Sequence, residues 1–288
     1  MGKRFDSMLF PGGKSKVFTL SYDDGVVQDR RLVELFNRFG VKCTFNLGYG
    51  VLGYKVTEPP FPGMKFVDIS KVEPDEVNSL YSEHEVGGHG LYHSDLTALG
   101  SPYAMYEILE DKVQLERLVG KPLKMFAYPF GFYNDDVKEY LRIAGYKGAR
   151  TVKSTYSFNL PADPLQLDPT CHHKDERLME LAKQFAEMRA FKASMFYVWG
   201  HGYEFDADDN WNVIEELVSY ISGFKDDIWF ATNGEILSYV EAFSRLEYSA
   251  DGSVIYNPTS TDLYMGTAFN RQEVLLAGKY NEIGDTPL

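Results

Sequence analysis

Apolar, β-prone stretches alternate with amphipathic helical stretches along most of the chain, and this alternation constrains the fold more than any other feature. The predicted strands lie at residues 16–22, 41–48, 85–89, 124–129, 146–151, 165–170, 194–201 and 228–233. Apolar residues recur with helical spacing at residues 29–40, 102–120 and 212–224. Strands that alternate with helices form parallel sheets, so we expect an α/β fold with a closed sheet.

The last part of the chain has a different pattern. A capping box formed by Thr232 and Glu235 predicts the start of the last helix. From about residue 250 the sequence changes to short alternating runs, which are typical of antiparallel strands. We therefore expect a barrel over residues 1–245 and a small antiparallel β extension, packed on the barrel, over residues 246–288.

Composition excludes several classes of protein. The 288 residues include 29 Lys and Arg against 42 Asp and Glu, a net charge of -13, which is the wrong sign for binding nucleic acid. Two cysteines, Cys43 and Cys171, are too few for a disulfide scaffold. No apolar run reaches the ~20 residues that a membrane span needs, and the first residues lack a signal peptide. A cytoplasmic location is the default expectation, or an extracytoplasmic one if a leader has been removed.

Acidic residues and histidines follow several of the predicted strands. Asp23 and Asp24, in SYDDG, end the strand at residues 16–22, where parallel folds collect their chemistry. His89 and His93, in HGLYH, are four residues apart, so on one helical turn both imidazoles face one ion. Two histidines and one carboxylate leave a coordination position open for water, and the second carboxylate can act as a base.

Each motif also has a simpler interpretation. Asp24 and Gly25 form a common turn sequence, and an isolated HxxxH arises by chance or on a surface. His201, at the end of the strand over residues 194–201, is either a structural residue or a general acid facing the same pocket. The functional interpretation depends on several strand ends meeting at one place.

The motifs SYDDG, HGLYH followed by SDL, AYPFG and WGH, in this order, resemble those of the polysaccharide deacetylases, the NodB-homology proteins of carbohydrate esterase family 4. The resemblance covers roughly residues 15–245. It implies a distorted (β/α) barrel and a metal-dependent deacetylase of acetylated sugars. It also implies a role for each matching residue: Asp23 as general base, Asp24, His89 and His93 as metal ligands, His201 as general acid, and the backbone N–H of Phe130 as an oxyanion donor.

Two of the family's motifs are altered in this chain. The third motif normally opens with an arginine that pairs with the catalytic aspartate, but Ala127 stands there. Our hypothesis is that Arg150 supplies the missing charge, and the alternative is that Arg150 forms a surface ion pair. The Asp-rich fourth motif is not recognisable. His172 and His173 occupy that region, where they either orient the base, touch the substrate or form a solvated pair.

The function expected from the resemblance is hydrolysis of acetyl groups on a polysaccharide or oligosaccharide. The expected metal is zinc, although cobalt, nickel or iron also suits two imidazoles and one carboxylate. The same site could instead attack another small amide or C–N bond. A third alternative is a carbohydrate-binding relative that has lost catalysis together with the arginine.

Overall fold

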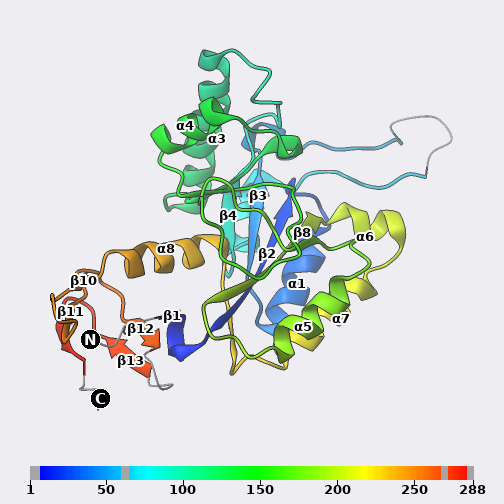
Figure 1. Cartoon of the computed structure of the whole chain (residues 1–288). Coiled ribbons are helices and arrows are strands. Elements are labelled where there is room, and N and C mark those ends of the chain that lie inside the picture. Colours follow the sequence, from blue (N-terminus) through cyan, green and yellow to red (C-terminus); the bar gives the residue numbers. More distant parts are fainter. Residues whose placement is uncertain (1–6, 60–64, 267–271, 284–288) are drawn as a thin grey trace.

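The computed structural model describes residues 7–59, 65–266 and 272–283, and its arrangement is shown in Figure 1. Within these residues eight parallel strands form one sheet in the order β6, β5, β4, β3, β2, β8, β7, and β9 also pairs with β2. The strands are β2 (Lys16–Asp23), β3 (Cys43–Leu47), β4 (Glu85–Gly88), β5 (Met125–Ala127), β6 (Gly148–Arg150), β7 (Cys171–His172), β8 (Ser194–His201) and β9 (Ile228–Phe230).

Strand β2 lies in the middle of this sheet and sets the register of the site. It pairs with β8 over all eight residues, so that Asp23 stands opposite His201. On its other side Asp23 stands opposite Asn46 of β3, while β9 pairs with the amino half of β2. Because every pairing is parallel, the carboxyl ends of the strands meet at one end of the sheet.

The sheet curls into the distorted (β/α) barrel that the sequence predicts. The segment at residues 164–172 bridges β6 and β8, the two sides of the opening. The Leu167 N–H donates to the Ala149 carbonyl of β6 over 2.9 Å, and the Thr170 N–H donates to the Tyr197 carbonyl of β8 over 2.8 Å. Curling therefore brings β6 close to β8 and β2, although β6 forms no ladder with either strand.

The predicted helices at residues 29–40, 102–120 and 212–224 are present. They correspond to α1 (Asp29–Phe39), α3 (Ser101–Val119) and α7 (Asn212–Ser222). The other described α-helices are α2 (Val77–Leu80), α4 (Asp135–Ile143), α5 (Leu178–Glu187), α6 (Tyr203–Asp208) and α8 (Asn233–Ser244), and α8 begins at the predicted capping box. Among the described helices, none combines the length and the apolar composition that a membrane span requires.

The strand predicted at residues 165–170 is wrong in extent. The regular pairing in this region is limited to β7, which starts at Cys171, and Leu167 forms a single bridge to Arg150. Pro169 lies inside the predicted stretch and has no N–H to donate to a ladder. The segment therefore connects the edges of the barrel without forming a full strand.

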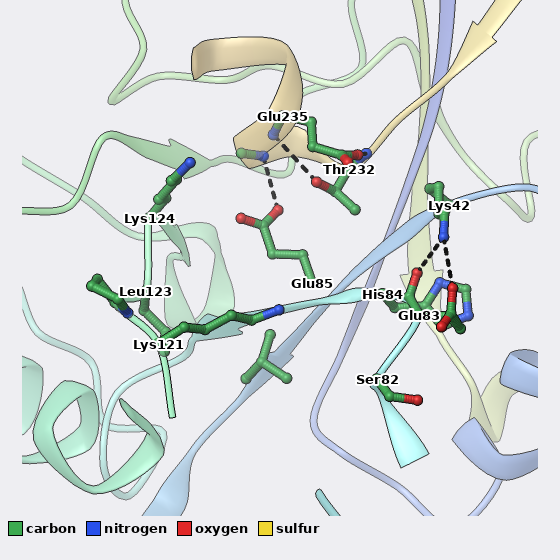
Figure 2. A pocket seen from close by; sticks show the side chains of 13 residues that line it. Lys42, Ser82, Glu83, His84, Glu85, Lys121, Leu123, Lys124, Thr232 and Glu235 are labelled. Carbon is green, nitrogen blue, oxygen red and sulfur yellow. Dashed lines mark hydrogen bonds and ion pairs between the residues drawn. The ribbon is translucent and has the colours of Figure 1, made fainter. Parts of the chain in front are cut away.

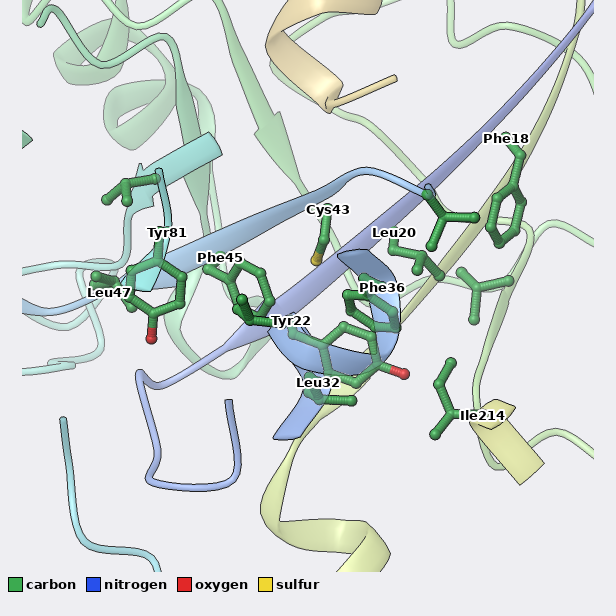
Figure 3. Close-up of a cluster of buried hydrophobic side chains, with 14 of the residues drawn as sticks. Phe18, Leu20, Tyr22, Leu32, Phe36, Cys43, Phe45, Leu47, Tyr81 and Ile214 are labelled. Atoms are coloured by element: carbon green, nitrogen blue, oxygen red, sulfur yellow. The ribbon is translucent and has the colours of Figure 1, made fainter. Parts of the chain in front are cut away.

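Helix α1 fixes the middle of the sheet from outside. Leu32 and Phe36 are one helical turn apart and buried, and the helix ends at Gly40 in the left-handed conformation, with φ 67°. The Phe36 ring lies 5.8 Å from the Tyr22 ring of β2 and 6.3 Å from the Phe45 ring of β3 (Figure 3). Burying each such ring contributes about 1.5–3 kcal/mol, so this face anchors β2 and β3.

Antiparallel strands form the predicted C-terminal extension, and the start of the chain joins them. One sheet contains β1 (Ser7–Leu9), β12 (Leu263–Gly266) and β13 (Gln272–Leu275), and the other contains β10 (Glu247–Tyr248), β11 (Val254–Tyr256) and β14 (Tyr280–Glu282). Leu263 and Met265 share a buried apolar cluster with Val17 and Met125 of the barrel. The division into domains at residues 245 and 246 stays a prediction.

Candidate active site

A pocket lies at the carboxyl ends of the barrel strands and brings the predicted site residues together. Its lining contains Asp23, Asp24, His89, His93, Tyr128, Phe130, Gly131, Arg150, Val152, Trp199, His201 and Tyr203. These residues lie at the ends of five different strands or directly after them: β2, β4, β5, β6 and β8. The pocket is therefore a product of the barrel closure and not of any one motif.

A second pocket lies at the opposite, amino ends of the strands (Figure 2). Several of its charged groups are already engaged with other groups of the protein. The Glu85 carboxylate accepts the Gly234 N–H at the start of α8 over 2.8 Å, and the Lys42 ammonium lies 3.5 Å from the Glu83 carboxylate. The Lys124 ammonium donates to Ser238 over 2.9 Å. The pocket at the carboxyl ends is therefore the stronger candidate for chemistry.

Asp23 is the last residue of β2, and Asp24 begins the turn that follows it. Asp24 takes the left-handed conformation with φ 81°, and its N–H donates to the Asn46 carbonyl over 2.9 Å. Gly25 follows with φ 58°, and a Cβ there would lie 2.8 Å from the Leu47 side chain. The turn therefore needs glycine, and it separates the two neighbouring carboxylates.

Asp23 is 1% exposed and is held by an ion pair with Arg150. One Asp23 oxygen accepts from the Arg150 guanidinium, and the other accepts from the Asn46 amide over 2.9 Å. Burial alone raises the pKa of Asp23, but Arg150, the two imidazoles of His89 and His201, and Asn46 lower it to about 2. Asp23 is therefore ionised at neutral pH. Arg150 thus pairs with Asp23, as we expect if it supplies the charge that Ala127 lacks. The pair is buried, so the alternative of a surface ion pair is wrong.

His89 and His93 lie on a turn after β4, not on a helical turn as the sequence analysis expects. Gly90 and His93 both take the left-handed conformation, with φ 76° and 56°, which a helix does not allow. The two rings still come together, with their centroids 4.6 Å apart. The spacing of four residues thus correctly predicts that the imidazoles lie close together. The helical turn on which that prediction is based is absent.

The ligand atoms of Asp24, His89 and His93 all lie within 4.8 Å of one another. The His89 Nδ1 lies 2.7 Å from the Ala127 carbonyl, which can only accept, so Nδ1 carries the proton and Nε2 offers its lone pair. Burial, the largest cause, lowers the pKa of His89 to about 4 and keeps the imidazole neutral. A carboxylate and two neutral imidazoles suit a divalent cation such as zinc, so these residues fit a metal centre.

Glu204, on α6, is a site residue that the sequence analysis missed. Its Oε2 accepts the His201 backbone N–H over 3.1 Å and lies 3.2 Å from the His201 Nδ1. Burial lowers the pKa of His201, but the carboxylates of Glu204, Asp23 and Asp24 raise it above its ordinary value. The spacing of three residues between His201 and Glu204 in HGYE is the only signal in the sequence.

His172 and His173 do not form a solvated pair, because both face Glu204. Their Nε2 atoms lie 3.2 and 3.4 Å from the Glu204 Oε2. His173 is 1% exposed and stacks on Phe205 with ring centroids 4.2 Å apart. The atoms of His172, His201 and Glu204 are also close enough to hold an ion. However, the Lys174 ammonium lies 3.5 Å from the Glu204 Oε1, and the pKa of His201 is raised, so this carboxylate already has cationic partners and we interpret the cluster as a support for His201.

The rim of the pocket is aromatic. Phe130 has φ 58° and is 56% exposed, and its ring centroid lies 4.5 Å from that of His93. The exposed ring of Phe132 follows at 6.0 Å. Deeper in the pocket the Arg150 guanidinium lies over the Trp199 ring at 4.3 Å, which packs the arginine in place. The Phe130 side chain thus borders His93, one of the candidate metal ligands.

The fold and the site define a parallel (β/α) barrel with a candidate metal centre at the carboxyl ends of its strands. The sequence profile of the polysaccharide deacetylase family matches residues 11–149. That range contains Asp23, Asp24, His89, His93 and Phe130. The resemblance of this chain to the polysaccharide deacetylases is therefore confirmed.

Solved structures agree with this assignment of the fold. A Mycobacterium smegmatis protein assigned to the polysaccharide deacetylases is 16% identical over 83% of this chain and 94% of that chain, with a TM-score of 0.60. A Bacillus anthracis pseudoenzyme of carbohydrate esterase family 4 is 15% identical over 79% of this chain and 66% of that chain, with a TM-score of 0.50. These likenesses establish the fold alone.

A Streptococcus pyogenes deacetylase in complex with acetate is 18% identical, but the similarity covers only 51% of this chain and 61% of that chain, with a TM-score of 0.42. The similarity thus covers 61% of the Streptococcus protein and 66% of the Bacillus protein, which is less than two thirds of each. No curated protein sequence matches the chain.

Metal binding can be tested with two histidine variants. We expect His93→Ala to abolish zinc binding, because it removes one of three ligands, and His172→Ala to retain it as the matched control from the second cluster. Isothermal titration of the metal-free proteins with zinc measures both. The opposite pattern would place the ion on His172, His201 and Glu204.

The support for His201 can be tested by its titration. Removing the negative charge of Glu204 removes the partner that favours the imidazolium, so Glu204→Gln should lower the pKa of His201. Nuclear magnetic resonance of the histidine ring protons in metal-free protein measures this value. Asp208→Asn, on the same helix, is the control, because that carboxylate pairs with Lys174. A pKa of His201 that stays the same in Glu204→Gln would contradict the assignment.

Proposed function

We propose that this protein is a divalent-metal-dependent hydrolase that removes acetyl groups from a polysaccharide or oligosaccharide. One observation carries the proposal: the candidate ligands Asp24, His89 and His93 share one pocket with Asp23 and His201. The His89 and His201 Nε2 atoms each lie 4.0 Å from the Asp23 Oδ2. The family match supports a carbohydrate deacetylase, whose reaction needs such a set of groups.

The proposed reaction adds water to the acetyl carbonyl and releases acetate and a free amine or hydroxyl. A divalent cation bound by Asp24, His89 and His93 would polarise the carbonyl and lower the pKa of the attacking water. Asp23 accepts a proton from that water. Its low pKa makes it a weak base in isolation, so the transfer depends on the acidity of the water.

His201 acts on the other side of the bond that breaks. In the proposed role its Nδ1–H donates to Glu204, while the protonated Nε2 faces Asp23 and gives its proton to the leaving group. The Phe130 N–H is the proposed donor to the developing oxyanion, and a backbone donor needs no particular side chain. Arg150 and Asn46 hold Asp23 in place and do not exchange protons.

The aromatic rim supports a sugar substrate. The exposed Phe130 lies next to the candidate ligand His93, and the exposed Phe132 lies next to Phe130. Their flat apolar faces match the C–H faces of sugar rings. The net charge of -13 suits a neutral or cationic substrate better than a polyanion.

Two other functions use the same residues differently. A hydrolase of another small amide would keep the site and differ in its loops. A non-catalytic carbohydrate-binding protein is a real alternative, because one structure with this fold is a pseudoenzyme. Against it, a binding protein has no use for an ionised Asp23 next to three candidate ligands and His201.

The proposal predicts that Asp23→Asn loses acetate release by about 10²–10⁴-fold, because it removes the general base, while zinc content stays unchanged. Acetate release should be measured with zinc added, on chitin oligomers, peptidoglycan fragments and acetylated xylan. Asp226→Asn, an exposed acid far from the site, is the matched control.

The substrate panel also distinguishes the alternatives. Absence of acetate release from every sugar, with zinc bound and activity on a small amide, would support the other hydrolase. Absence of all hydrolysis, with retained sugar binding, would support the non-catalytic protein.

A further inference from the structure

Two carboxylates on α3 are buried next to the candidate metal ligands. Asp111 is 0% exposed and Glu107 is 7% exposed, and they lie one helical turn apart on the same face. Among the described residues neither forms an ion pair with a lysine, arginine or histidine. A buried carboxylate without a counter-charge costs several kcal/mol, so its oxygens must find other partners.

The partners are the N–H and hydroxyl groups of the turn that carries His89 and His93. The Asp111 Oδ2 accepts the His89 N–H over 3.1 Å. One turn earlier on α3, the Glu107 Oε2 accepts the Tyr92 N–H over 2.9 Å, and its Oε1 accepts the Ser94 hydroxyl over 3.0 Å. The two carboxylates therefore bind the turn at both ends, beside each of the two histidines.

A further contact ties Asp111 to the loop after β3. The Asp111 Oδ1 accepts the Tyr49 N–H over 2.7 Å. Asp111 thus joins two loops at the carboxyl end of the barrel, one of which contains His89.

The turn needs such support because its backbone is unusual. His93 takes the left-handed conformation, which costs a residue with a Cβ on the order of 1 kcal/mol or more. This conformation is part of what aims the His93 ring towards that of His89. The charge-assisted bonds from Glu107 to the neighbouring Tyr92 and Ser94 offset this cost.

The glycine pair in β4 makes room for the supporting side chains. A Cβ on Gly88 would lie 3.1 Å from the Asp111 Oδ2 and 2.3 Å from the Tyr146 hydroxyl, and a Cβ on Gly87 would lie 2.4 Å from the Asn46 amide oxygen. Gly88 therefore admits the carboxylate that holds His89, and Gly87 admits the amide that holds Asp23.

We propose that Asp111 and Glu107 are positioning residues that fix His89 and His93 at the separation at which both imidazoles bind one divalent cation. Groups that orient metal ligands typically change metal affinity by 10- to 100-fold when they are removed. The proposal rests on the metal centre of the proposed function but not on the substrate or the reaction.

The chemistry of the two carboxylates predicts different responses to amide substitution. Both Asp111 oxygens accept backbone N–H groups, so an Asn there must turn its NH₂ towards a donor, and one bond is lost. One Glu107 oxygen accepts a hydroxyl, which can reverse and accept from the NH₂ of a Gln. Asp111→Asn should therefore impair the turn, whereas Glu107→Gln should preserve it.

The test is titration of the metal-free full-length proteins with zinc, together with the absorption spectrum of the cobalt-substituted proteins. Asp111→Asn and Glu107→Ala should lower zinc affinity by about 10- to 100-fold, and Glu107→Gln should stay within about threefold of the wild type. Glu110→Gln is the matched control, because among the described residues that carboxylate accepts a hydrogen bond only from Gln114 on the same helix. Circular dichroism establishes that each variant is folded.

Unchanged zinc affinity in Glu107→Ala would overturn the proposal, and so would an equal loss in Glu107→Gln and Glu107→Ala. The comparison of Glu107→Ala with Glu107→Gln tests the proposal even if Asp111→Asn does not fold. Wild-type protein that binds no zinc would overturn the metal centre and this proposal with it, whereas tight binding by all variants would overturn this proposal alone.

Discussion

The buried ion pair between Asp23 and Arg150 is the interaction on which the rest of the site depends. The two residues come from β2 and β6, which are separated in the sheet by three other strands. They meet only because the sheet curls and the segment at residues 164–172 joins β6 to β8. Removing one partner of such a pair leaves a buried unpaired charge and typically costs 3–5 kcal/mol, so the pair links the barrel closure to the site.

Charges alternate outward from this pair. Asp23 lies between the Arg150 guanidinium and the imidazoles of His89 and His201, and Glu204 holds His201 from behind. Each group is oriented by a neighbour of opposite charge or by a carbonyl, as His89 is by Ala127. A site preorganised in this way would need little rearrangement to bind the proposed substrate and metal, because its dipoles already point into the pocket.

Much of this arrangement could be predicted from the sequence. The alternation of strands and helices predicts the parallel sheet. The alanine at position 127, where the family has an arginine, predicts that Arg150 supplies the missing charge. Glu204 was missed because the Asp-rich fourth motif is absent and because acidic residues on a short helix resemble a solvated surface. Asp111 and Glu107 were missed for a related reason, since their spacing on α3 is also that of an exposed helix face. Only the packing of α3 against the turn after β4 shows that these carboxylates are buried.

The central claim is that Arg150 of β6 replaces the arginine that the family carries at the position of Ala127. The most direct measurement is the turnover number of Arg150→Ala with and without a second substitution, Ala127→Arg, at a temperature where each variant is folded. A misaligned base costs about 10²-fold, so we predict that loss in Arg150→Ala and a recovery of at least tenfold in the double variant. Full activity of Arg150→Ala would contradict the claim.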